Sequence, residues 1–131
     1  MELLRAEGLS LDIRFAPLDD EGWMWWNAVI HVPGFRGDLD FQMLKADLYM
    51  FRTRLSASTI AENWPCDARL ASTDPGMDLS FRVERTGQVV GEYQFGGCRA
   101  QPPLLSGTFG MDQTYLGPLL AQIDGVLADL D

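Results

Sequence analysis

Residues 110–116, Gly-Met-Asp-Gln-Thr-Tyr-Leu, decide how the C-terminal part of this chain folds. Leu104 to Met111, which runs into this stretch, has the partly apolar pattern of an extended strand. After them, apolar residues recur at helical spacing, namely Leu116, Leu119, Leu120, Ile123, Leu127 and Leu130. The Asp112 carboxylate stands at the changeover, where it can accept from the free N–H groups of the first helical turn. The stretch therefore predicts a strand followed by a capped helix.

A second change of period lies earlier in the chain, between Met43 and Leu44. Phe35 to Met43 alternates apolar with polar residues, which predicts a strand. The apolar residues that follow share one helix face, namely Leu44, Leu48, Phe51 and Leu55. We expect a helix from about Leu44 to Ser56 or Ser58.

The other segments predict further strands separated by turns. Alternation indicates strands at residues 9–15, 23–32, 68–72, 79–83 and 89–95. Turn residues lie at 17–22, 33–34, 74–76 and 85–88. In the last helix, Pro118 has no N–H, so we expect a tight turn over Gln113 to Gly117 and Pro118 at the first helical position. The order is thus three strands, a helix, about four strands and a helix.

This order predicts one α+β domain over residues 1–131. We expect an antiparallel sheet of about six or seven strands with two helices packed on one face. The other face would be left partly open. Hydrophobic residues make up 47% of the chain, enough to build a core.

The sequence also indicates where in the cell the protein lies and whether its cysteines are oxidised. No apolar run approaches the roughly 20 residues that span a bilayer, and the acidic start lacks a signal-peptide core. We expect a cytoplasmic, bacterial-type protein. Cys66 and Cys98 match no zinc or redox spacing, so we expect free thiols in a reducing cytosol.

The charge is strongly acidic, with 19 Asp and Glu against 10 Lys and Arg and a formal net charge of −9. Such a chain repels nucleic acid and anionic membranes, so neither is an expected partner. A basic protein partner would be steered toward it. Plain solubility explains the same excess.

No residue pattern indicates catalysis, a metal or a cofactor. His31 is the single histidine, and the sequence gives it no partner for acid–base work. Asp19, Asp20 and Glu21 lie in a turn without calcium-loop spacing. There is no nucleophile elbow and no glycine-rich phosphate loop. We therefore expect a protein that is not an enzyme.

The aromatic residues of strand 23–32 favour a binding role instead. Alternation places Met24 and Trp26 on the core face, and Trp23 and Trp25 on the opposite face near His31. Exposed aromatics beside a polar rim are typical binding anchors, although covering segments would explain them equally well. The candidate partner-binding residues are Trp23, Trp25, His31, Asp38 and Asp40.

From Trp23 to Leu127 the chain resembles the WapI-like family of small bacterial immunity proteins and related domains of unknown function. The similar features are the tryptophan-rich strand, the turn Gly34-Phe35-Arg36-Gly37, the helix ending near Leu55, and Asp-Gln-Thr-Tyr-Leu at 112–116. The resemblance implies no catalytic residues. It implies an inhibitor that neutralises a toxin domain, such as a nuclease or another intracellular enzyme. The alternatives are a small cytoplasmic ligand-binding domain and a self-associating domain that forms a homodimer through the same face.

Overall fold

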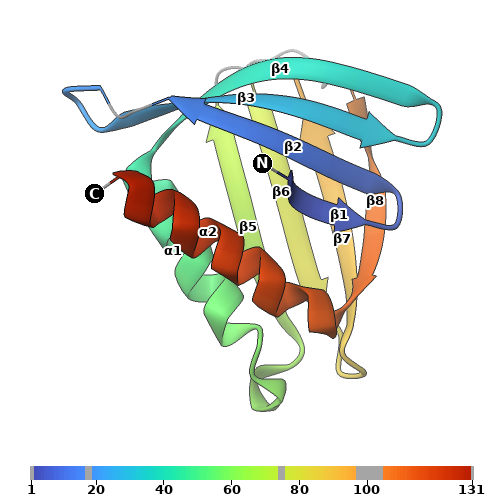
Figure 1. Cartoon of the computed structure of the whole chain (residues 1–131). Coiled ribbons are helices and arrows are strands. Elements are labelled where there is room, and N and C mark those ends of the chain that lie inside the picture. Colours follow the sequence, from blue (N-terminus) through green and yellow to red (C-terminus); the bar gives the residue numbers. More distant parts are fainter. Residues whose placement is uncertain (1, 17–18, 74–75, 97–104, 131) are drawn as a thin grey trace.

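Two four-stranded antiparallel meanders, each followed by a helix, make up the computed structural model (Figure 1). The structure describes residues 2–16, 19–73, 76–96 and 105–130. Sheet A runs in chain order through β1 (Glu2–Ala6), β2 (Leu9–Ala16), β3 (Trp23–Val32) and β4 (Phe35–Leu44), and α1 (Lys45–Ala57) follows. After the 3-10 turn η1 (Ala61–Asn63), sheet B runs through β5 (Cys66–Thr73), β6 (Gly76–Val83), β7 (Gln88–Phe95) and β8 (Leu105–Asp112). The turn η2 (Gln113–Tyr115) then leads into α2 (Leu116–Leu130).

The α+β class and the antiparallel pairing are confirmed, whereas the expected single sheet of six or seven strands is two sheets of four. The sheets separate between β4 and β5 because α1 leaves the end of β4 and packs against β5. At the opposite edges, Glu7, the residue after β1, forms one bridge with Gly110 of β8. There the Glu7 and Gly110 amides each donate to the other residue's carbonyl at 2.9 Å.

One core joins both sheets and both helices. The Phe41 ring of β4 lies 6.2 Å from the Phe95 ring of β7, between centroids, so the two sheets pack against each other. The Phe51 ring of α1 lies 5.6 Å from the Phe81 ring of β6. The expectation that helices alone cover one sheet face was therefore incomplete, because sheet A covers part of the inner face of sheet B.

Aromatic rings and glycines alternate across the strand pair β7–β8. Phe109 pairs with Gly91, and Tyr93 pairs with Gly107. A Cβ added to Gly91 would overlap the Phe109 ring, and one added to Gly107 would overlap Tyr93. The rings thus lie over the neighbouring glycines, and the Phe109 ring also meets Phe81 edge to face at 5.2 Å.

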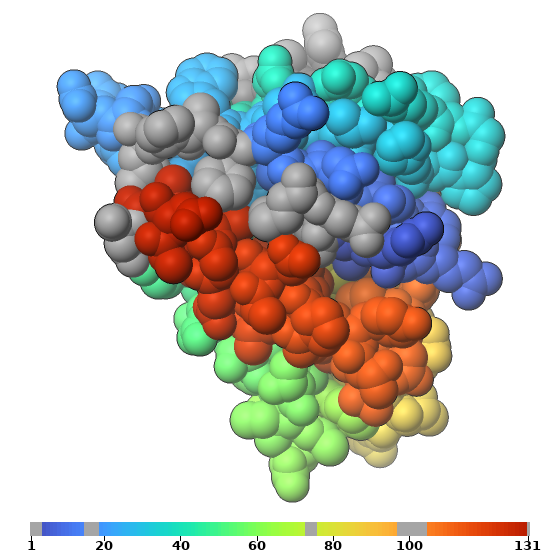
Figure 2. Space-filling model, in the orientation of Figure 1, coloured from blue at the N-terminus to red at the C-terminus, as the bar shows by residue number. Residues whose placement is uncertain are grey.

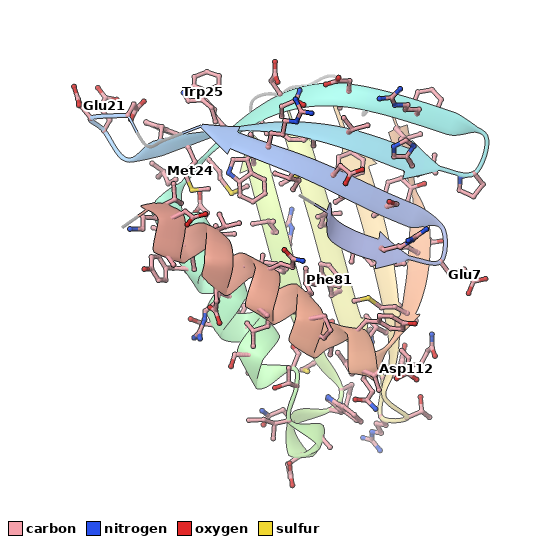
Figure 3. All side chains as sticks on the ribbon, in the orientation of Figure 1. Glu7, Glu21, Met24, Trp25, Phe81 and Asp112 are labelled. Atoms are coloured by element: carbon pink, nitrogen blue, oxygen red, sulfur yellow. The ribbon has the colours of Figure 1, made fainter. Side chains whose placement is uncertain are left out.

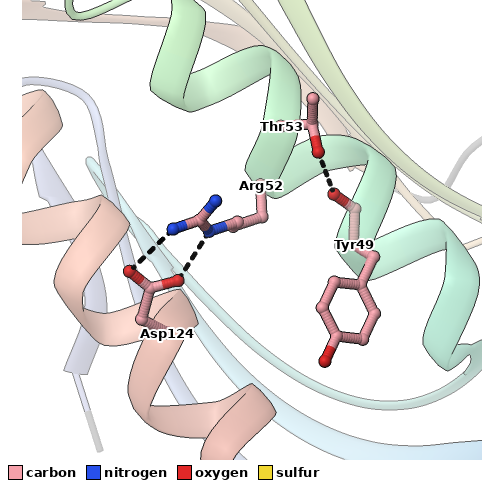
Figure 4. A network of polar contacts seen from close by, with 4 residues as sticks. All are labelled: Tyr49, Arg52, Thr53 and Asp124. Carbon is pink, nitrogen blue, oxygen red and sulfur yellow. Dashed lines mark hydrogen bonds and ion pairs between the residues drawn. The ribbon is translucent and has the colours of Figure 1, made fainter.

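Helices α1 and α2 lie side by side and are joined by an ion pair (Figures 1 and 4). Arg52 Nε donates to Asp124 Oδ1 at 2.7 Å, and Nη2 lies 3.5 Å from Oδ2. This hydrogen bond and the Asp124 charge raise the pKa of Arg52 above its ordinary value. Within α1, Thr53 Oγ1 donates to the Tyr49 carbonyl at 3.1 Å. The pair is partly exposed, so it orients the helices more than it stabilises them.

The start of the last helix confirms one prediction and corrects another. Asp112 Oδ1 accepts from the Thr114 amide at 2.9 Å, so Asp112 caps this junction through η2. However, α2 begins at Leu116, which makes Pro118 its third residue and not its first. This position is tolerated because the first N–H groups of a helix have no acceptor within it.

Several predicted features lie outside the described residues, namely Cys98, the turn at 74–75 and the segment opened by Pro102 and Pro103. Cys66 at the start of β5 is a half-buried free thiol. Within the described ranges, no helix has the length and apolar character to cross a membrane.

Candidate functional site

Strand β3 separates its side chains between the core and the solvent, as the alternation predicted. Met24 and Trp26 are 0% and 2% exposed, whereas Trp25 is 49% exposed. Figure 3 shows Trp25 pointing away from the core and Met24 pointing toward it. Trp23, two residues before Trp25 on the same face, is half-buried. The result is a large aromatic ring held in solvent on a strand.

The register of the β3–β4 hairpin brings all five predicted binding residues onto one face. The Pro33–Gly34 turn closes the pair Val32–Phe35, and each later pair follows from it. On this face the β3–β4 pairs are Trp23–Leu44, Trp25–Gln42, Asn27–Asp40, Val29–Asp38 and His31–Arg36. Strand β2 adds Asp12 and Arg14, opposite Val29 and Asn27. We call this set the outer face of sheet A.

Two carboxylates at the centre of this face are held by one amide. Asn27 Nδ2 donates to Asp38 Oδ1 at 2.7 Å and to Asp40 Oδ1 at 2.9 Å. The amide thus bonds to one oxygen of each carboxylate and holds the two negative side chains close to each other. Asp38 and Asp40 are both exposed, so the second oxygen of each carboxylate can accept a hydrogen bond from a binding partner.

Positive groups flank this acidic pair without an ion pair to it among the described residues. Arg14 stands opposite Asn27 on β2, and Arg36 stands opposite His31 on β4. A shallow hollow of about 400 Å³ lies between these side chains, with the half-buried Val29 in its lining. The face therefore carries both signs of charge around one apolar contact.

The turn between β2 and β3 adds acids at the Trp25 end of the face. Asp19 Oδ1 accepts from the Glu21 and Trp23 amides, both at 2.9 Å, and Gly22 closes the turn with φ of 84°. Asp20 and Glu21 are exposed, and Figure 3 shows Glu21 at the tip of the loop. Because Asp19 accepts from both amides, the turn that carries Asp20 and Glu21 is held in place just before Trp23.

Asn27, Arg14 and the loop acids Asp20 and Glu21 also belong to this site, although they were not predicted as parts of it. The signal for Asn27 was present, since the two-residue turn at Pro33–Gly34 fixes the register that places it beside Asp40. The position of Arg14 beside Asn27 depends on the register of β2 with β3, which are joined by a longer loop. Asp20 and Glu21 fitted a solvated turn, and the structure shows that this turn leads directly into β3 at Trp23.

This arrangement suits the recognition of a cationic surface. Carboxylates can accept from Lys or Arg side chains, and an exposed indole can hold a cation over its face. His31 is exposed, and no described side chain hydrogen-bonds to it. Within the described ranges, no group of three or more His, Cys, Asp or Glu side chains could hold a metal ion.

Comparison with protein family models, curated proteins and solved structures gives no match for this chain.

Proposed function

We propose that this protein is a non-catalytic binding protein that holds another protein against the outer face of sheet A. The observation that carries the proposal is Trp25, which is 49% exposed on a regular strand. Binding energy at protein interfaces concentrates in a few residues, and tryptophan is prominent among them. A rigid strand presents the ring without the entropic cost of ordering a loop.

The charges around Trp25 favour a basic partner. Asp38 and Asp40 lie along the face on one side, and the loop acid Glu21 lies toward the other end. A Lys or Arg of the partner could stack on the indole and pair with a carboxylate. The net charge of −9 would also steer a basic protein toward the chain and raise its association rate.

The specific form of this function that we propose is inhibition of a bacterial toxin domain. The resemblance to WapI-like immunity proteins supports it, and the acidic, aromatic face is compatible with it. Nuclease toxins need basic surfaces to bind phosphate groups. An acidic inhibitor that occupies such a surface would block the substrate without any chemistry of its own.

Co-expression tests the proposal directly. A gene beside this one that encodes a secreted protein with a variable C-terminal toxin domain supplies the candidate toxin. We expect this chain to restore growth and to be retained with that domain in a pull-down. No growth rescue, together with no binding at micromolar concentration, would remove the toxin-inhibitor function.

Two variants locate the contact. Trp25→Ala should weaken the complex by at least about tenfold, because the anchor ring is lost. Val90→Ala is the matched control, since Val90 is 44% exposed on the outer face of sheet B. Equal losses of affinity in the two variants would show that the partner does not bind at Trp25. Light scattering of the free chain checks the homodimer alternative: a dimer that Trp25→Ala dissociates would assign this face to self-association.

A further inference from the structure

A second candidate site lies where the two sheets come apart. Beyond the Glu7–Gly110 bridge, β1 and β8 diverge, and the start of α2 lies beside the opening. A cavity of about 600 Å³ occupies this space, which is within the usual range for ligand sites. Figure 2 shows the blue atoms of β1 beside the orange atoms at the end of β8 and the start of α2. We call it the seam cavity.

Main-chain groups of β1 face the seam cavity. Glu7, in the turn that follows β1, directs its amide and carbonyl toward β8, where Gly110 bonds to both. Ala6 pairs with Leu9 of β2 next to the turn, and main-chain direction alternates along a strand, so the amide and carbonyl of Arg5 point away from β2, toward the same side as those of Glu7. No described main-chain group of β8 bonds to Arg5 there. The edge of β1 is therefore left with one donor and one acceptor directed at the cavity.

The floor of the seam cavity is apolar. Leu4 of β1, Met111 of β8 and Leu119 of α2 all line it, and they are 4%, 6% and 4% exposed. These side chains come from three elements of the core, so the floor is held rigidly. An apolar side chain of a ligand would contact carbon on three sides.

Polar side chains stand around the rim with their hydrogen-bonding capacity unused. Arg5, Gln88, Tyr115 and Gln122 line the cavity. Among the described residues, none of these four side chains makes a hydrogen bond or an ion pair. Asp112 also lines the rim, but one of its oxygens caps η2. Convergent polar groups over an apolar floor are typical of a binding site.

We propose that the seam cavity binds a short extended peptide segment that carries an apolar side chain and no acidic side chain. The segment would add to the open edge of β1, with its amide and carbonyl paired to those of Arg5. Its apolar side chain would enter the floor between Leu4 and Leu119. Because the two acids Glu7 and Asp112 outnumber Arg5 at the rim, an acidic ligand meets net repulsion there, and a neutral one does not.

Amide NMR spectra of the full chain test this site with a defined probe, N-acetyl-Val-Leu-Val-amide. We expect saturable shifts of the Arg5, Glu7 and Gly110 amides, with Trp25 and its neighbours unmoved. N-acetyl-Asp-Ala-Asp-amide, added at the same concentrations, should leave the cavity resonances unchanged. No saturable shift at the seam with the neutral peptide, or equal shifts with both peptides, would overturn the proposal.

Two tryptophan substitutions on α2 provide the matched control. Gln122→Trp places a large ring at the cavity rim and should weaken peptide binding by at least about tenfold. Ala121→Trp adds the same ring at an exposed position that does not line the cavity, and should leave the affinity unchanged. Equal affinity in the two variants would exclude the seam cavity as the site. Trp25→Ala should retain peptide binding. The seam-cavity proposal and the proposed function of the outer face of sheet A are therefore tested independently.

Discussion

Single glycines decide how closely β7 and β8 can be covered by aromatic rings. Gly91 and Gly107 have no side chain, so Phe109 and Tyr93 can lie directly over the backbone of the opposite strand. Both rings are at least nine-tenths buried, which makes this contact part of the core. A glycine in a strand interior lowers intrinsic strand stability, and ring contact compensates for that cost here.

Gly91→Ala should therefore destabilise the protein, because the new Cβ overlaps the Phe109 ring. We expect a loss of about 1–3 kcal/mol in the free energy of unfolding, measured by urea denaturation. Gly125→Ala is the control, since Gly125 lies in α2 with no atom within 4 Å of the added Cβ. It should stabilise by about 0.5–1 kcal/mol. The same sign for both substitutions would contradict the described packing.

Asp112, at the end of β8, should affect stability and not the proposed binding face. Asp112→Ala removes the acceptor of the Thr114 amide and should cost about 0.5–2 kcal/mol of unfolding free energy. Affinity at the outer face of sheet A should not change. Asp129→Ala removes an acid near the C-terminal end of α2, where it opposes the helix dipole, so it should not destabilise. A toxin-affinity loss in Asp112→Ala would extend the interface to this end.

At the scale of elements, α1 is held by one buried face. Leu48, Phe51 and Leu55 are 0%, 2% and 0% exposed, whereas Met50 is 61% exposed. Because the Phe51 ring contacts Phe81 of sheet B, this helix connects the end of sheet A to the core of sheet B. Tertiary packing, more than intrinsic helix preference, stabilises a helix of 13 residues.

Phe51→Ala should cost about 3–5 kcal/mol in urea unfolding, because the substitution leaves a cavity between α1 and β6. Met50→Ala changes the solvent side of the same helix and should stay within about 0.5 kcal/mol of the parent chain. A similar loss of unfolding free energy in the two variants would show that α1 does not bury the Phe51 face as described.

At the scale of the whole molecule, the proposed function predicts that charge controls how fast a basic toxin domain is captured. We expect the association rate to fall steeply with added salt, measured by stopped-flow mixing. The double variant Asp38→Asn, Asp40→Asn should associate more slowly and depend less on salt. Glu92→Gln, an exposed change on the outer face of sheet B, should associate more nearly like the parent chain. A rate independent of salt would exclude electrostatic steering.

The parts of this fold that local periodicity controls could be predicted, and those that depend on distant packing could not. Strand Trp23–Val32 has the predicted bounds, and α1 differs from its prediction by about one residue. Strand β1 is short and lacks alternation, so it was missed. The division into two sheets follows from α1 packing on β5, which no local pattern encodes. Likewise, periodicity placed Trp25 on the outer face, but only the register joined Asn27 to Asp38 and Asp40.

The meander order of the sheets has a consequence for synthesis on the ribosome. All strand pairs within each sheet join neighbours along the chain, so sheet A can pair before sheet B has been translated. However, Phe41 and Phe51 pack against rings that emerge later, Phe95 and Phe81. The nascent first half therefore exposes an apolar surface until the second half arrives. We expect this interval to be the period in which molecular chaperones bind the growing chain.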